Sequence, residues 1–168
     1  THLPVGLDNA GYTWTDLHGE GIPGILTEQA DTWFYQRNLS PDTALSNDHG
    51  DTVRFGPLEV VAAKPNTTLA AHASFMDLAG DGQPDLVQFD GPTPGLFEHD
   101  TAEGWKPFRA FGSRLNRDMR DPNLRLIDLV GDGHSDVLIS EHDGFQWHQS
   151  LAEDGFGPAT QTSRALDE

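Results

Sequence analysis

The sequence predicts an all-β protein made of about three copies of one four-stranded unit, and three observations favour this fold. An acidic, glycine-rich turn occurs three times within the 168 residues. Short runs of β-branched, aromatic and aliphatic residues surround each turn, as strands do. No 12-residue stretch carries apolar residues at positions i, i+3, i+4 and i+7, the pattern of a helix that packs against a core.

The repeated turn has the same length in every copy, and its copies align without gaps over residues 14–26, 75–87 and 126–138. The leading aspartates, Asp16, Asp77 and Asp128, lie 61 and 51 residues apart. Two further landmarks follow each turn: an aromatic residue and then a Phe-Gly pair. The aromatic residues are Trp33, Phe97 and Trp147, and the pairs begin at Phe55, Phe111 and Phe156. The whole unit is therefore repeated, not the turn alone.

Strands are expected on both sides of the turns, over residues 12–17, 31–36, 85–90, 124–129, 136–141 and 144–149. The polar stretches 39–51 and 115–123 are expected to be loops. About 50 residues with about four short strands is typical of one β-propeller blade. We predict one propeller segment with approximate repeats 1–62, 63–113 and 114–168, since a β-sandwich with acidic turns would not explain repetition of the whole unit.

Three blades are too few for a closed ring. A propeller usually has about four to eight blades, and an open arc exposes strand edges and two apolar blade faces. We therefore predict a partial β-propeller whose ring is completed either by the rest of a larger protein or by self-association of this chain.

Composition excludes several classes of protein. The chain has 10 Lys and Arg against 27 Asp and Glu, a net charge of −17, which disfavours nucleic acid and anionic membranes as partners. It has no cysteine, which excludes disulfides, thiolate metal sites and cysteine nucleophiles. No apolar run is long enough to span a membrane, and the first residues show no signal-peptide pattern.

The second and third turns carry carboxylates at positions 1, 5 and 9 and glycine at positions 4 and 6, a spacing that suits a calcium loop. The predicted ligands in the second turn are Asp77, Asp81, the Gln83 carbonyl and Asp85. Those in the third are Asp128, Asp132, the His134 carbonyl and Asp136. Position 3 is Ala79 or Val130, so each structural site is expected to be weak, with a dissociation constant of about 10⁻⁴–10⁻³ M.

Two qualifications accompany the calcium prediction. An alternative is a metal-free turn in which Asp77 and Asp128 accept backbone N–H bonds, as in Asx turns. The first turn has Asp16 and Glu20 at positions 1 and 5 but Gly24 at position 9. It lacks the last ligand, and we expect it to bind no metal.

No catalytic motif stands out, and we predict that the protein is not an enzyme. His-Glu-x-x-His, Gly-x-Ser-x-Gly and the phosphate-binding Gly-rich loop are all absent from the sequence. The tryptophans could stack on sugars, but aromatic residues fixed within a repeat more often fill the core between blades. These residues are Trp14, Trp33, Trp105 and Trp147.

The motif Asp-x-x-Gly-Asp-Gly-x-x-Asp with a later Phe-Gly resembles the FG-GAP/VCBS repeat of integrin-type propellers, fully in two units and partly in the first. A second resemblance covers nearly the whole chain, through residues 12–29, 33–39, 55–61, 121–129, 137–143 and 150–159. These segments are similar to the propeller region of bacterial insecticidal toxin-complex B components and of the related plasmid virulence protein B (SpvB/TcaC) family.

The resemblance implies a role and partners. In that family the B component joins a C-type Rhs component in a hollow shell around a toxic peptide. Its propeller docks on the pore-forming A component and gates the exit of the toxin. We therefore expect a secreted, non-catalytic docking and gating module. The alternative is a carbohydrate-binding, lectin-like propeller or an integrin-like adhesion propeller with calcium-stabilised loops, and the partner of the lectin-like form would be a glycan.

Overall fold

The computed structural model describes residues 11–40, 54–69, 73–100, 102 and 104–163. Within these residues the protein forms three four-stranded antiparallel sheets, a two-stranded hairpin and one short 3-10 helix, η1 (Ala152–Asp154). The prediction of an all-β protein with three four-stranded units is confirmed. None of the described helical structure is long and apolar enough to cross a membrane.

Blades 1 and 3 are simple meanders, in which consecutive strands are hydrogen-bonded neighbours. Blade 1 consists of β1 (Tyr12–Thr15), β2 (Gly24–Gln29), β3 (Thr32–Gln36) and β4 (Glu59–Val60). Blade 3 consists of β11 (Leu124–Ile127), β12 (Asp136–Ser140), β13 (Gly144–Ser150) and β14 (Phe156–Ser163). In both blades the acidic turn joins the first strand to the second.

Blade 2 contains an insertion. Its sheet has the order β5 (Ala73–Met76), β6 (Asp85–Gln88), β7 (Gly95–Phe97) and β10 (Arg109–Ala110). Between the third and fourth strands of this sheet, β8 (His99–Asp100) pairs with β9 (Gly104–Trp105) in a separate hairpin. This hairpin was not predicted from the sequence, because strands of two residues are too short to show a periodic pattern.

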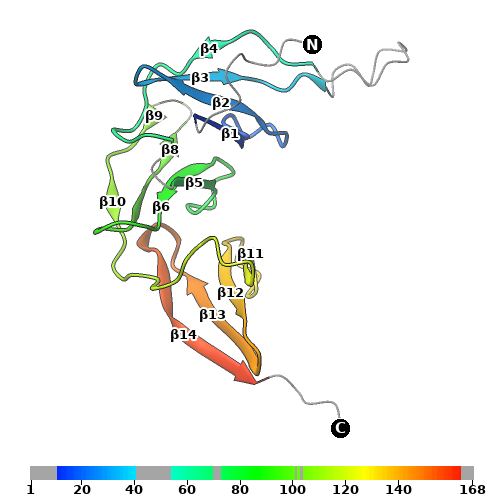
Figure 1. Cartoon of the computed structure of the whole chain (residues 1–168), viewed down its shortest axis with the longest axis vertical. Helices are drawn as coiled ribbons and strands as arrows, with labels where there is room; N and C mark the ends of the chain where they lie inside the picture. The colour runs from blue at the N-terminus through cyan, green and yellow to red at the C-terminus, as the bar shows by residue number, and fades with distance from the viewer. Residues whose placement is uncertain (1–10, 41–53, 70–72, 101, 103, 164–168) are drawn as a thin grey trace.

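The three sheets follow one another around a curve (Figure 1). Their first strands, β1, β5 and β11, lie close together on the concave side, while the fourth strands, β4, β10 and β14, lie far apart on the convex side. This radial arrangement is that of neighbouring propeller blades. It differs from a β-sandwich, in which two sheets pack face to face. We call the face of each blade that is directed toward the next blade its forward face, and the other its backward face.

Two apolar seams hold the arc together. The first seam, between blades 1 and 2, buries Leu17, Leu26, Trp33, Tyr35 and Leu86. It is largely aromatic, because the rings of Trp33, Phe75 and Trp105 meet edge to face with centroids 5.9 to 6.3 Å apart. Such contacts add to the free energy gained by burying the ring area.

The second seam, between blades 2 and 3, is largely aliphatic. Its buried residues are Leu78, Val87, Leu96, Leu124, Val137, Ile139 and Phe156. Strand β6 supplies both seams, since its side chains alternate between the two faces of the sheet: Leu86 enters the first seam and Val87 the second. Of the four tryptophans, Trp33 and Trp105 fill the first seam, whereas Trp14 lies on the backward face of blade 1 and is 53% exposed.

Candidate functional site

The leading aspartate of each acidic turn anchors the turn by accepting backbone N–H bonds. Asp77 Oδ1 accepts from Gly80 at 2.7 Å and Asp81 at 3.1 Å, and Oδ2 accepts from Gly82 at 2.9 Å. Asp128 accepts the three corresponding bonds, at 2.6, 3.2 and 2.9 Å. The N–H groups, first among them that of Gly133, hold the pKa of Asp128 below its usual value. Asp16 accepts from Glu20 at 2.8 Å and from Gly21.

The position-5 residues differ between the turns. Asp81 Oδ1 accepts the N–H of Gln83 at 2.8 Å, and Asp132 Oδ1 accepts that of His134 at 3.0 Å. Both bonds are local Asx turns. In the first turn, Glu20 instead forms an ion pair with Arg37, the residue that follows β3.

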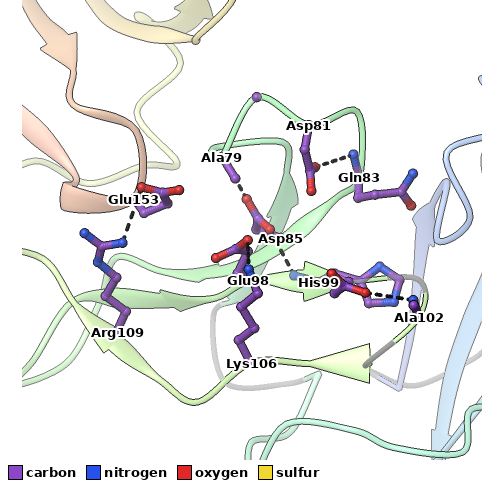
Figure 2. A network of polar contacts seen from close by, with 12 residues as sticks. Ala79, Asp81, Gln83, Asp85, Glu98, His99, Ala102, Lys106, Arg109 and Glu153 are labelled. Carbon is purple, nitrogen blue, oxygen red and sulfur yellow. Dashed lines mark hydrogen bonds and ion pairs between the residues drawn. The ribbon is translucent and has the colours of Figure 1, made fainter.

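The position-9 aspartates are buried and tie the turn to β8 in blade 2 and to β13 in blade 3. Asp85 is fully buried; its Oδ2 accepts the N–H groups of Leu78 at 3.0 Å and Ala79 at 2.9 Å, and its Oδ1 accepts that of His99 at 3.1 Å. Figure 2 shows Asp85 between the turn and His99. Burial raises the pKa of Asp85 above its ordinary value, and the three N–H bonds oppose that rise.

Asp136 has the same role in blade 3. It is fully buried and accepts from Leu129 at 3.0 Å and from Ser150 at 2.7 Å. In both blades, position 9 therefore links the start of the turn to the chain at or just after the end of the third strand, at the same end of the sheet.

The first turn replaces this carboxylate with a phenol. The N–H of Leu17, which corresponds to Leu78 and Leu129, donates to Tyr35 Oη at 3.3 Å, and Tyr35 Oη donates to the Thr15 carbonyl at 3.2 Å. A Cβ at Gly24 would lie 2.5 Å from Tyr35 Oη, so the phenol occupies the space where a side chain at position 9 would go. The sequence showed only the missing carboxylate and not its replacement, because an aromatic residue follows the turn in every unit.

The position-7 side chains reach across to the turn of the preceding blade. Gln83 lies over Gly19, where a Cβ would come within 2.5 Å of Gln83 Nε2. His134 lies over Gly80 in the same manner, and its Nδ1 donates to the Leu78 carbonyl at 3.3 Å. The glycine at position 4 thus meets two needs, a positive φ in its own turn and room for a side chain from the next.

All the predicted calcium ligands lie in these turns. Every predicted aspartate accepts at least one backbone N–H bond, as the metal-free alternative requires. Within the described ranges, no three His, Asp or Glu side chains gather in a cluster that could hold a metal ion. The calcium sites stay a prediction, and a test is given below.

The first seam opens into a pocket of about 380 Å³ between β4 and the β8–β9 hairpin. Its wall includes Tyr35, His99 and Trp105, and the rings of the last two are stacked with centroids 4.5 Å apart. Burial lowers the pKa of His99, which favours the neutral imidazole. Glu59 and Asp100 also line the pocket, and no described lining residue is Lys or Arg. The pocket therefore suits a neutral or cationic ligand better than an anion.

The opposite ends of the sheets carry arginines together with carboxylates that pair with them. The segment between β10 and β11 contributes Arg114, Arg117 and Arg120, three of the ten Lys and Arg residues. Arg114 donates to the Gly91 carbonyl in the β6–β7 connection, and Arg117 lies 3.2 Å from Glu141 beyond β12. Since hairpin connections alternate between the two ends of a sheet, these arginines lie at the end away from the acidic turns.

The similarity of this chain to known proteins is found at the level of structure. A scan against protein-family models finds no match, and a search of curated proteins finds none either. Among solved structures, the chain is similar to part of the Tc holotoxin pore of Photorhabdus luminescens, in a form with a mutated TccC3. The two share 23% identity over 95% of this chain and 7% of that one, with a TM-score of 0.70. The chain therefore shares its fold with a small part of that holotoxin chain.

Two further structures are similar at lower scores. An Agrocybe aegerita lectin that recognises non-reducing terminal N-acetylglucosamine matches with 18% identity over 92% of this chain and 38% of its own, at a TM-score of 0.50. A TcdB2–TccC3 structure without its hypervariable C-terminal region matches with 12% identity over 92% of this chain and 12% of its own, at a TM-score of 0.45. The chain spans only a small part of each toxin-complex chain.

Proposed function

We propose that this chain is a non-catalytic β-propeller module of a bacterial toxin-complex B-like protein, secreted with it, that docks on a pore-forming A-type subunit and gates the toxin held by a C-type Rhs component. The observation that carries the proposal is the structural similarity to the Tc holotoxin pore over 95% of the chain. The FG-GAP/VCBS-like turns and the B-component-like segments of the sequence support it. The three radial blades and the two charged ends supply surfaces for docking.

A binding experiment with a purified A-type pore subunit tests the proposal. The immobilised chain should bind the subunit saturably, and lower salt should strengthen binding if charged ends take part. Asp81→Lys with Asp132→Lys reverses charge at the turn end, and Arg114→Glu with Arg120→Glu reverses it at the arginine end. The pair of substitutions at the end that docks should weaken binding, and the pair at the other end should leave binding unchanged and so serves as the control. No binding at any salt concentration would refute the docking role.

The second candidate function is carbohydrate binding, with a lectin-like site in the first seam. The pocket beside His99 and Trp105 favours it, because an aromatic wall and carboxylates suit a hydroxylated neutral ligand. The similarity to the Agrocybe aegerita lectin supports the same idea. A glycan array probed with and without EDTA separates the candidates. Binding that Trp105→Ala abolishes and Trp14→Ala leaves intact would support the pocket, and an array without signal would favour docking.

A further inference from the structure

A cavity of about 420 Å³, which we call the arginine cavity, lies between β13 and the segment that joins β10 to β11. The segment supplies Arg114, Asn116 and Arg117 to its wall, and β13 supplies Gln146 and His148. None of these described wall residues is Asp or Glu, although acids outnumber bases 27 to 10 in the whole chain. Small-molecule sites have volumes of about 300–1,000 Å³. The cavity therefore has the size of such a site and the charge that attracts an anion.

The charge of the two arginines is compensated only in part. Arg114 Nη2 donates to the Gly91 carbonyl, and no carboxylate of the described residues forms an ion pair with this arginine. Arg117 Nη2 donates to Gln146 Oε1 and lies 3.2 Å from Glu141 Oε1, outside the cavity wall. Each guanidinium has five N–H groups, and these contacts use Nη2 alone. They hold both side chains in place and leave the other N–H groups for a ligand.

Polar residues form the β13 side of the cavity at positions where the repeat does not need them. Gln146 and His148 pair with Ile139 and Val137 of the second seam, so they lie on the backward face of blade 3. Gln146 is 7% exposed. The residues at the two equivalent positions are Phe34 and Gln36 in blade 1 and Gly95 and Phe97 in blade 2. Blade 3 alone combines two polar side chains here, which points to a ligand and not to a requirement of the fold.

The ring of His148 has one nitrogen without a partner. Nδ1 donates to the Gly157 carbonyl at 3.0 Å, so Nε2 of the neutral ring is an acceptor. Nε2 is buried and has no hydrogen-bond partner in the part of the chain that the structure describes. An unpaired buried polar atom costs free energy, which a proton donor in the cavity would recover. A well-matched ligand thus brings negative charge for the arginines and a proton for Nε2.

A phosphate group meets both requirements. The second pKa of a phosphomonoester is about 6, so near neutral pH the group carries negative charge and still holds a proton for part of the time. A carboxylate, with a pKa of about 4, brings charge but no proton, and sulfate does the same. The planar fork of the guanidinium also matches the geometry of phosphate oxygens.

We propose that the arginine cavity binds a small phosphorylated molecule through its phosphate group. Arg114 and Arg117 donate to the phosphate oxygens, and Nε2 of His148 shares a proton with one of them. The net charge of −17 repels nucleic acids and anionic membranes, which leaves a small molecule as the source of the phosphate. This inference does not depend on the proposed toxin-complex function.

Titration calorimetry with inorganic phosphate at about pH 6 is the first test. Wild type should bind phosphate at one saturable site. Arg114→Gln and Arg117→Gln should each weaken binding by about tenfold or more, since each removes charge-assisted hydrogen bonds. Arg120→Gln is the matched control, because Arg120 belongs to the same segment but lines a neighbouring cavity and not this one. No saturable heat in wild type, or equal weakening by all three substitutions, would overturn the inference.

A second test separates phosphate from other anions. Sulfate has the same shape but no proton, so wild type should bind it about tenfold more weakly than phosphate. His148→Phe keeps a ring, as Phe97 does at the equivalent position, and should reduce phosphate binding to the level of sulfate. Urea denaturation checks that every variant is folded. Equal affinities of wild type for the two anions would overturn the choice of phosphate. Binding of a hexaglutamate peptide without binding of phosphate would make an acidic protein segment the occupant and overturn the inference.

Discussion

The turns of blades 1 and 2 supply different acceptors for the same buried backbone N–H group. In both, the N–H of the residue after the leading aspartate is buried and needs an acceptor. Blade 2 supplies the fully buried Asp85, whereas blade 1 supplies Tyr35 Oη from the third strand. A neutral hydroxyl can thus perform the hydrogen bonding of the position-9 carboxylate, so this aspartate has a structural role in the fold whether or not it also binds a cation.

The difference also predicts unequal costs of mutation. Asp85 serves three backbone N–H groups, while Tyr35 Oη accepts one and donates to one carbonyl. A buried donor left without a partner costs about 1–3 kcal/mol. Blade 2 should therefore depend more on its carboxylate than blade 1 depends on its phenol.

Asp85→Ala should give the largest loss of stability. It leaves the N–H groups of Leu78, Ala79 and His99 without an acceptor, which should lower the free energy of unfolding by at least about 3 kcal/mol. Urea denaturation followed by tryptophan fluorescence measures this. Asp81→Ala is the control, since Asp81 is exposed and accepts only the N–H of Gln83. Equal losses for the two variants would refute the role assigned to Asp85.

Tyr35→Phe should have a smaller effect. It keeps the ring in the first seam but removes the acceptor of Leu17 N–H and the donor to the Thr15 carbonyl. We expect a loss of about 1–2 kcal/mol by the same urea measurement. Tyr12→Phe, at a residue that is 40% exposed, should be neutral. If Tyr35→Phe were equally neutral, the phenol would not be replacing the aspartate.

Asp128 at position 1 of the third turn and Asp85 at position 9 of the second should respond to pH in opposite directions. The pKa of Asp128 is lowered, so its stabilisation is present above the unfolded-state value of about 3.9 and is lost as pH falls through the folded value. The pKa of Asp85 is raised, so the native state binds the proton more tightly and stability falls as pH rises from about 3.9 to the folded value.

Asparagine variants measure this contrast. Between roughly pH 3 and 6, the stability difference between wild type and Asp128→Asn should grow with pH, and that between wild type and Asp85→Asn should shrink. Urea denaturation at several pH values gives both differences. Parallel pH profiles would contradict the opposite assignments.

Calcium should have the smallest effect. With a dissociation constant of about 10⁻⁴–10⁻³ M, 1 mM calcium would stabilise the protein by about 0.4–1.4 kcal/mol for each site. Calorimetry should detect two weak sites in wild type and lose the heat of one in Asp81→Ala. Equal heats for the two proteins would remove the second turn as a site, and no heat in either would remove the calcium prediction.

The sequence predicted the strands that contain short runs of β-branched, aromatic and aliphatic residues, but it did not predict β14, which is mostly polar and exposed. Residues 12–17 were expected as one strand, but β1 ends at Thr15, since the N–H of Leu17 turns toward Tyr35 instead of the neighbouring strand. The tyrosine could not be assigned this role from sequence, since the bond joins residues 18 positions apart. The position-7 contacts were also missed, because they join different repeats.

Glycines at position 4 have an effect beyond their own repeat. Since Gly80 makes room for His134, replacing this glycine should disturb the following blade as well as the turn that contains it. A substitution at position 4 of one repeat should therefore affect the repeat that follows it. Two adjoining repeats form the smallest fragment in which the position-7 side chain of one repeat covers the turn of the other. Duplication or deletion of repeats should therefore preserve stability best when whole pairs are duplicated or deleted.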